Sequence, residues 1–186
     1  MKQIFFLLLL AALNAHAQDD NSSGRIRAGV AYVHDFPGLN GAGAYAEYSF
    51  PLNAFIQGGA GIRRVQTAGY PRTASVREYT RATSLEASLL FSLYQTENTA
   101  FRIGAGYSFS FYNIRRSYPV YTAHTDNQPA GISWPQKDAT GRTSGVSLSA
   151  EYEYYFSNVF SAGAKVSLCK AYGSVVMAGP FAAIRL

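Results

Sequence analysis

The side chains that most often carry out catalysis are scarce in this chain. It has three histidines and one cysteine, whereas acyl hydrolysis or transfer would need a histidine beside a serine nucleophile and a carboxylate. His34 directly precedes Asp35, and His124 lies two residues before Asp126, but neither histidine has a serine at a spacing that would complete a triad. We therefore expect no enzyme, with a lipid-modifying enzyme as the alternative.

Metal and nucleotide binding are not indicated either. Metal sites need several histidines, cysteines or carboxylates close together, and one cysteine, Cys169, with two histidines beyond the expected signal peptide, His34 and His124, gives no such cluster. The glycine-rich residues 58–61 and 104–106 resemble phosphate-binding loops, but they lie inside alternating segments with no helix after them. We expect no metal and no cofactor, and we expect these glycines to face a crowded interior.

The composition favours an ordered protein with an unusually uncharged surface. Charged residues make up 15% of the 186 residues, compared with about 25% in ordinary soluble domains. The 14 tyrosines and 12 phenylalanines exclude a disordered chain. The formal net charge of +5 could suggest nucleic-acid binding, but the N-terminus indicates export from the cytoplasm.

The first 17 residues have the features of a secretory signal peptide. Lys2 supplies a positive charge, residues 4–13 form an apolar run too short to span a bilayer, and residues 15–17 have the Ala-x-Ala form of a cleavage site. We expect cleavage after Ala17, a polar leader over residues 18–24 and a folded domain over residues 25–186. The alternative is an apolar helix that belongs to the folded domain.

Beyond the leader, apolar and small polar residues alternate with a period of two, which is typical of β-strands. Eight segments of 7–14 residues show this pattern, and they predict eight strands of roughly 9–14 residues. Such strands exceed the roughly 5–6 residues usual in soluble proteins and suit a tilted membrane crossing. The segments are residues 25–32, 44–50, 54–63, 83–93, 101–111, 143–156, 160–168 and 174–186.

The connections between these segments alternate in length. Residues 51–53, 96–98 and 157–159 read as tight turns, whereas residues 66–81 and 115–141 are long and polar. Short turns on one side and longer loops on the other are typical of outer-membrane barrels. An even number of strands places both termini on the short-turn side. A three-residue turn after Phe156 would place Phe156 opposite Phe160 and Glu151 opposite Lys165.

The two faces of the alternating segments differ sharply. One is apolar and aromatic, and the other carries glycine, serine and a balanced set of charges that could pair inside a closed lumen. A soluble lipocalin-like barrel would turn the apolar face inward, whereas a membrane barrel turns it outward. Aromatic residues near the segment ends fit an interfacial girdle and favour the membrane. The charged residues of the polar face are Arg27, Glu47, Arg63, Glu86, Arg102, Glu151, Glu153 and Lys165.

These features predict an all-β fold, an eight-stranded antiparallel up-and-down transmembrane β-barrel. The chain resembles the small eight-stranded outer-membrane β-barrel families, which include the membrane domain of outer-membrane protein A and the opacity-type surface proteins. The resemblance covers residues 25–186. It implies a monomer in the outer membrane of a Gram-negative cell, insertion by the barrel-assembly machinery, no nucleic-acid partner, and a structural or surface-interaction role. A narrow channel for small solutes is the alternative, although eight strands leave little space beyond their own side chains.

The last segment departs from the usual form of this family. Residues 179–186 resemble the terminal strand that the assembly machinery reads, but Leu186 stands where an aromatic residue is usual. Pro180 cannot donate to a strand ladder, and we expect a bulge there.

The two long connections are rich in arginine, with tyrosines between the basic residues. Guanidinium groups bind phosphate oxygens bidentately, and lipopolysaccharide is the nearest polyanion outside such a cell. We therefore expect contacts to its phosphates from Arg72, Arg77, Arg115 and Arg116. The alternative is that these loops are merely solvated.

Overall fold

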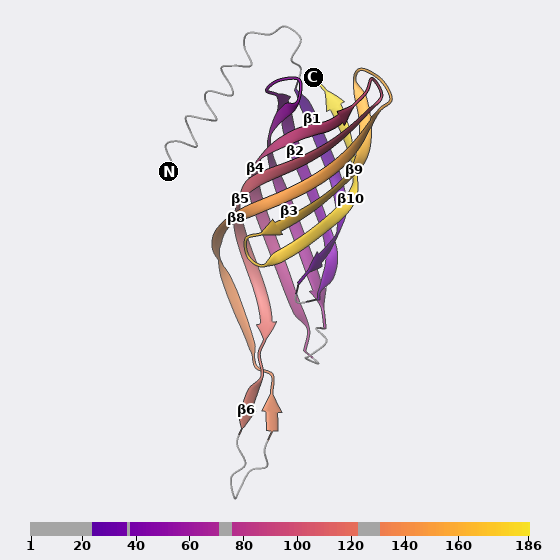
Figure 1. Cartoon of the computed structure of the whole chain (residues 1–186). Helices are drawn as coiled ribbons and strands as arrows, with labels where there is room; N and C mark the ends of the chain where they lie inside the picture. The colour runs from indigo at the N-terminus through magenta and orange to yellow at the C-terminus, as the bar shows by residue number, and fades with distance from the viewer. Residues whose placement is uncertain (1–23, 37, 71–75, 123–130) are drawn as a thin grey trace, which may run out of the picture.

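The computed structural model describes residues 24–36, 38–70, 76–122 and 131–186, most of which lie in β-strands. Eight strands close into an antiparallel barrel in the order β1-β10-β9-β8-β5-β4-β3-β2, and β6 and β7 form a separate two-stranded sheet (Figure 1). This confirms the predicted fold. The strands are β1 Arg25–Asp35, β2 Asn40–Pro51, β3 Ile56–Gly69, β4 Glu78–Gln95, β5 Thr99–Ser117, β6 Val120–Thr122, β7 Gly131–Ser133, β8 Gln136–Tyr155, β9 Phe160–Lys170 and β10 Ser174–Arg185. Within the described residues, no helix is long and apolar enough to cross a membrane.

The apolar face of the sheet points outward, as the membrane arrangement predicts. In β1, Val30 is 62% exposed, whereas Arg27 is 1% exposed. In β4 and β5 the contrast is the same, because Leu85 is 54% exposed and Arg102 is fully buried. Side chains alternate between the two faces of a strand, so one period-two pattern produces both an apolar exterior and a charged interior. This arrangement is the reverse of a lipocalin-like barrel.

The outward face of β5 shows the thickness of the apolar belt. Its outward residues run from Phe101 through Ile103, Tyr107 and Phe109 to Phe111, and these five side chains are all exposed. These residues extend about 34 Å along the strand. A barrel tilt of 35–45° projects that length to about 24–28 Å, which matches the apolar band of about 25 Å in outer-membrane barrels.

The long connections contain more strand than predicted. β5 and β8 stay paired up to Ser117 and Gln136, so the described ends of these two strands project beyond the barrel as a pair (Figure 1). The prediction was wrong here because it used the contrast between an apolar and a polar face. That contrast disappears where both faces meet water, although the backbone ladder continues.

The last strand has no bulge at Pro180. Its register with β9 is continuous through Pro180, which pairs with Ala164. Its register with β1 is the same on both sides of the proline, so the predicted bulge is wrong. The ladder to β1 omits Pro180, which agrees with the missing amide hydrogen. A register shift occurs instead between β4 and β5, at Ser92 and Tyr94.

Candidate functional site

Four buried charged side chains form the inner ion network of the lumen. Arg27 of β1, Arg102 of β5, and Glu151 and Glu153 of β8 are each no more than 1% exposed. Glu151 Oε1 accepts hydrogen bonds from Nη1 of Arg27 at 2.9 Å and of Arg102 at 3.0 Å. Arg102 Nη1 also donates to Glu153 Oε2 at 2.6 Å. Each carboxylate therefore contacts both guanidinium groups.

The network extends toward the end of the barrel that carries the two termini. Arg25 Nη1 donates to the Tyr155 hydroxyl at 2.9 Å and lies 3.4 Å from Glu153 Oε2. Ser161 Oγ donates to Glu153 Oε1 at 2.5 Å, and Arg102 also donates to the Tyr155 hydroxyl. Both oxygens of Glu153 thus have partners. Such satisfaction is what makes a buried ion pair tolerable.

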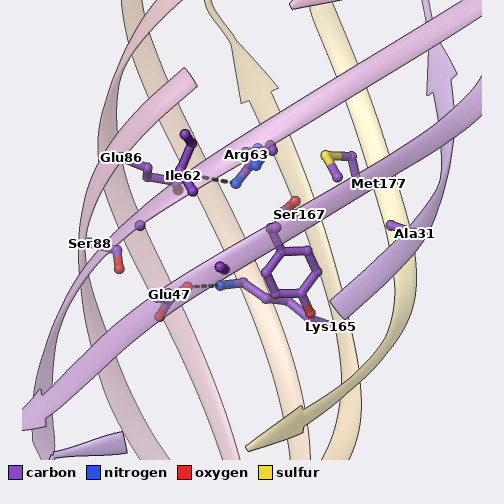
Figure 2. Close-up of a pocket in the computed structure, with 12 residues that line it drawn as sticks. Ala31, Glu47, Ile62, Arg63, Glu86, Ser88, Lys165, Ser167 and Met177 are labelled. Atoms are coloured by element: carbon purple, nitrogen blue, oxygen red, sulfur yellow. Dashed lines mark hydrogen bonds and ion pairs between the residues drawn. The ribbon is translucent and has the colours of Figure 1, made fainter. Parts of the chain in front are cut away.

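Two further ion pairs lie inside the lumen (Figure 2). Lys165 Nζ of β9 donates to Glu47 Oε2 of β2 at 2.7 Å, and Arg63 of β3 donates to Glu86 of β4. Glu151 and Lys165 are direct partners in the β8–β9 ladder, as predicted. Their charged groups nevertheless bind other residues. Glu151 binds Arg102 on the neighbouring strand β5 and Arg27 on β1, and Lys165 binds Glu47 on β2. The contacts with β1 and β2 reach three strands around the barrel, which a narrow lumen allows.

A small cavity beside these pairs shows how little space remains in the lumen. Its lining includes Tyr45, Glu47, Arg63, Lys165 and Met177, and its volume is about 20 Å³. That volume holds about one water molecule. Side chains therefore fill the lumen almost completely at this level.

An apolar cluster separates the central pairs from the outer end of the barrel. Ala31 and Val33 of β1 pack with Val65, Val175 and Met177 in the interior. Their place follows from β1, on which they lie between Arg27 and Asp35. The interior is therefore layered, with charged groups on both sides of an apolar layer.

A second ion network, the outer network, lies beyond the apolar cluster. Asp35 Oδ2 accepts hydrogen bonds from Thr67 Oγ1 at 3.0 Å, from Thr80 Oγ1 at 3.1 Å and from Arg116 Nη2 at 3.1 Å. Glu78 Oε2 lies 3.6 Å from the same guanidinium group. Sequence reasoning missed this network. The alternation of the strands could have indicated it. Arg116 lies an even number of residues from the inward Arg102 on the same strand, and Asp35 lies an even number from the inward Arg27, so both should point inward.

The four arginines predicted to contact lipopolysaccharide are placed differently from one another. Arg72 lies outside the described residues. Arg77 is exposed, and Arg115 points outward on the projecting part of β5. Arg116 points inward to the outer network. The structure thus brings Arg77 and Arg115 together along one external groove and separates Arg116 from them.

Arg115 forms a bidentate ion pair on the projecting hairpin. Its Nε and Nη2 donate to the two carboxylate oxygens of Asp138 at 2.7 and 2.8 Å. These hydrogen bonds hold the pKa of the Asp138 carboxyl below its usual value. The Arg115 guanidinium also lies 5.2 Å from the centre of the Tyr79 ring.

The histidine and the cysteine that the structure describes lie apart, His34 on the exposed face and Cys169 buried. His34 Nδ1 lies 2.7 Å from Asn40 Oδ1 on the exposed face, and His124 falls outside the described residues. Cys169 is buried and free. Among the described residues, no group of three histidines, cysteines or carboxylates is close enough to hold a metal ion.

A closed eight-stranded antiparallel barrel with an apolar outer belt and paired charges inside is an integral β-barrel of the outer-membrane class. The chain is similar in fold to Neisserial surface protein A, with 12% identity and a TM-score of 0.57 over 89% of this chain and 96% of that one. That likeness agrees with the family resemblance predicted from the sequence.

Two further solved structures are similar at lower TM-scores. They are the N-terminal β-barrel domain of Pseudomonas aeruginosa OprF (17% identity, TM-score 0.49, 91% of this chain and all of that one) and Yersinia pestis Ail (13%, 0.47, 88% and 96%). No protein-family model matches the chain, and no curated protein matches it in sequence.

Proposed function

We propose that this protein is a plugged outer-membrane barrel with a structural and surface-interaction role in the cell envelope. The observation that carries the proposal is the inner ion network, in which Arg27, Arg102, Glu151 and Glu153 join strands β1, β5 and β8 across the lumen. Eight strands enclose only enough space for side chains, and these groups occupy it. The proposal therefore disfavours a channel for small solutes.

Planar-bilayer recordings test the plug. The wild-type barrel is expected to show no steady conductance, because paired charged side chains occupy its lumen. The double variant Arg102→Ser with Glu151→Ser should conduct ions, since it replaces two long buried side chains with small ones. Glu97→Ser, in the exposed turn between β4 and β5, is the control and should stay closed. Steady conductance of the wild-type barrel would instead favour the channel.

The proposed partner on the lipid side is lipopolysaccharide. Arg77 and Arg115 support this proposal, since both lie at the external groove near the outer end of the barrel. Insertion by the barrel-assembly machinery and a monomeric state complete the proposal. The enzymatic alternative receives no support from His34, because its described ring contact is with Asn40.

A protein partner is the second candidate, and a free strand edge favours it. Residues 136–145 of β8 pair with β5, whereas the β8–β9 ladder begins only at Val146 and Lys170. One edge of β8 therefore has no neighbouring strand among the described residues. Unpaired edge groups can accept an added strand from another protein.

Hydrogen exchange of the refolded barrel checks whether this edge is open. In an antiparallel strand with one neighbour, alternate amides are hydrogen-bonded, so residues 136–145 should show alternating slow and fast exchange. Residues 146–154 have strands on both sides and provide an internal control with uniformly slow exchange. Uniform protection over residues 136–145 in the isolated barrel would show that the edge is already covered.

A further inference from the structure

The outward faces of five adjacent strands end in basic residues where the apolar belt stops. In β3, Arg64 is the next outward residue after Ile62, and in β9, Lys170 follows Leu168. In β4, β5 and β8 one small or polar outward residue lies between the last apolar outward residue and the basic one. We call this set the basic collar, and its members are Arg64, Arg81, Arg115, Arg142 and Lys170.

The strand register places these side chains close together. Arg64 pairs with Thr83, Thr83 with Phe111 and Phe111 with Arg142, so Arg64 and Arg142 share one outward row. Neighbouring strands lie about 4.8 Å apart, and three strand steps therefore separate the two arginines by about 14 Å. Arg81 lies in the next row toward the outer end, opposite Gln66.

Most of the basic collar lacks an anionic partner in the part of the chain that the structure describes. Within the described residues, Arg115 pairs with Asp138, whereas Arg64, Arg81, Arg142 and Lys170 form no ion pair within 4.0 Å. Like charges gathered on one sheet face repel each other. An external anion that bridges them would remove this repulsion and gain charge-assisted hydrogen bonds.

Aromatic rings hold the guanidinium groups of the collar at the edge of the belt. The guanidinium groups of Arg81 and Arg115 lie 5.3 and 5.2 Å from the centre of the Tyr79 ring. The guanidinium group of Arg142 lies 5.6 Å from the centre of the Phe111 ring. Stacking on a ring uses the guanidinium face and leaves its N–H groups free for an anion. Arg81 and Arg115 line an open groove of about 420 Å³, and Gln66 and Gln136 line the same groove.

The collar is confined to one end of the barrel. At the end that carries the termini, the exposed outward residues include the aromatic side chains of Tyr94, Phe101, Tyr154 and Phe160 and the aliphatic ones of Ile26 and Ile184. The collar therefore lies on the outer-leaflet side, at the depth of lipid headgroups. We infer that it binds the phosphates of a phosphorylated glycolipid headgroup in that leaflet. This inference rests on the proposed outer-membrane function and assigns the lipid contact to strand residues of the barrel wall.

The test uses the refolded full barrel in detergent micelles, titrated with fluorescently labelled lipid A and followed by anisotropy. The triple variant Arg64→Gln, Arg81→Gln and Arg142→Gln should bind about tenfold more weakly, since each exposed charged contact contributes roughly two- to threefold. Added salt should reduce wild-type affinity and narrow this difference. Lipid A stripped of its phosphates should bind the wild type and the triple variant equally.

Two other variants separate the collar from the loops. Lys137→Gln removes one exposed charge from the projecting part of β8, five residues from Arg142, and should bind as the wild type does. The double variant Arg72→Gln with Arg77→Gln tests the loop residues. If the collar triple variant bound as the wild type does and the Arg72→Gln, Arg77→Gln variant bound more weakly, the inference that the collar binds the phosphates would be wrong. The proposed lipid partner would still stand. If the wild-type barrel bound dephosphorylated lipid A as tightly as intact lipid A, both the collar and the proposed lipid partner would be overturned.

Discussion

Glu151→Gln should lower the free energy of unfolding of the barrel by about 3–5 kcal/mol. The Glu151 side chain is 1% exposed, and its Oε1 accepts hydrogen bonds from both Arg27 and Arg102. A glutamine keeps the shape but removes the charge, so Arg102 retains only the Glu153 carboxylate. Arg27 retains Glu153 at 3.4 Å and Glu47 at 3.7 Å. Denaturant titration of the refolded barrel in detergent measures the change.

Glu97→Gln is the matched control. Glu97 is exposed in the turn between β4 and β5, so the same substitution should change the unfolding free energy by about 0.5 kcal/mol or less. A double-mutant cycle with Arg102→Gln adds a second readout, because residues in one network should give a combined loss smaller than the sum of the separate losses. Equal losses for Glu151→Gln and Glu97→Gln would contradict the buried network.

The sequence predicted that the eight charged residues of the polar face lie inside the barrel, but not which residues they bind. Strand parity places Arg27, Glu47 and Lys165 inside, because a period of two leaves only two faces. The three-residue turn before Phe160 also predicts the local register of Glu151 and Lys165 correctly. Lys165 nevertheless binds Glu47, which is 118 residues away. That contact forms because β1 and β10 pair to close the barrel, which brings β2 and β9 near each other. No local sequence pattern predicts that closure.

The outer end of the barrel was predicted less well for a different reason. Asp35 and Arg116 pair inside the barrel, yet Asp35 is the last residue of β1 and Arg116 lies near the end of β5, both beyond the alternating segments on which the prediction rests. The signal in a membrane strand is the contrast between lipid and lumen, and it fades at the lipid headgroups. For the same reason Arg115, which faces outward on a paired strand, was assigned to a loop.

Gly163→Ala should destabilise the barrel by about 3 kcal/mol or prevent its folding. Gly163 lies in β9 opposite Glu153 of the inner ion network. A methyl group at this position would lie 2.0 Å from the carbonyl oxygen of Tyr152 and 2.7 Å from the Phe181 ring. The carbonyl belongs to the neighbouring strand backbone and cannot rotate away. Forcing extra atoms into packed space typically costs about 1–3 kcal/mol, and more where backbone must move.

The Phe181 ring also has little freedom to retreat, because the Arg27 guanidinium lies 5.8 Å from its centre and is itself bound to Glu151. A shift at Gly163 would therefore disturb the inner ion network as well as the β8–β9 ladder. The matched control is Gly69→Ala at the end of β3, where the nearest atom to an added methyl group, Leu39 Cδ2, is 3.5 Å away. Heat-modifiable gel mobility gives the folded fraction of each variant, and denaturant titration gives its stability. Gly69→Ala should match the wild type in both, and a Gly163→Ala barrel that also matched it would mean that β8 and β9 do not approach each other this closely.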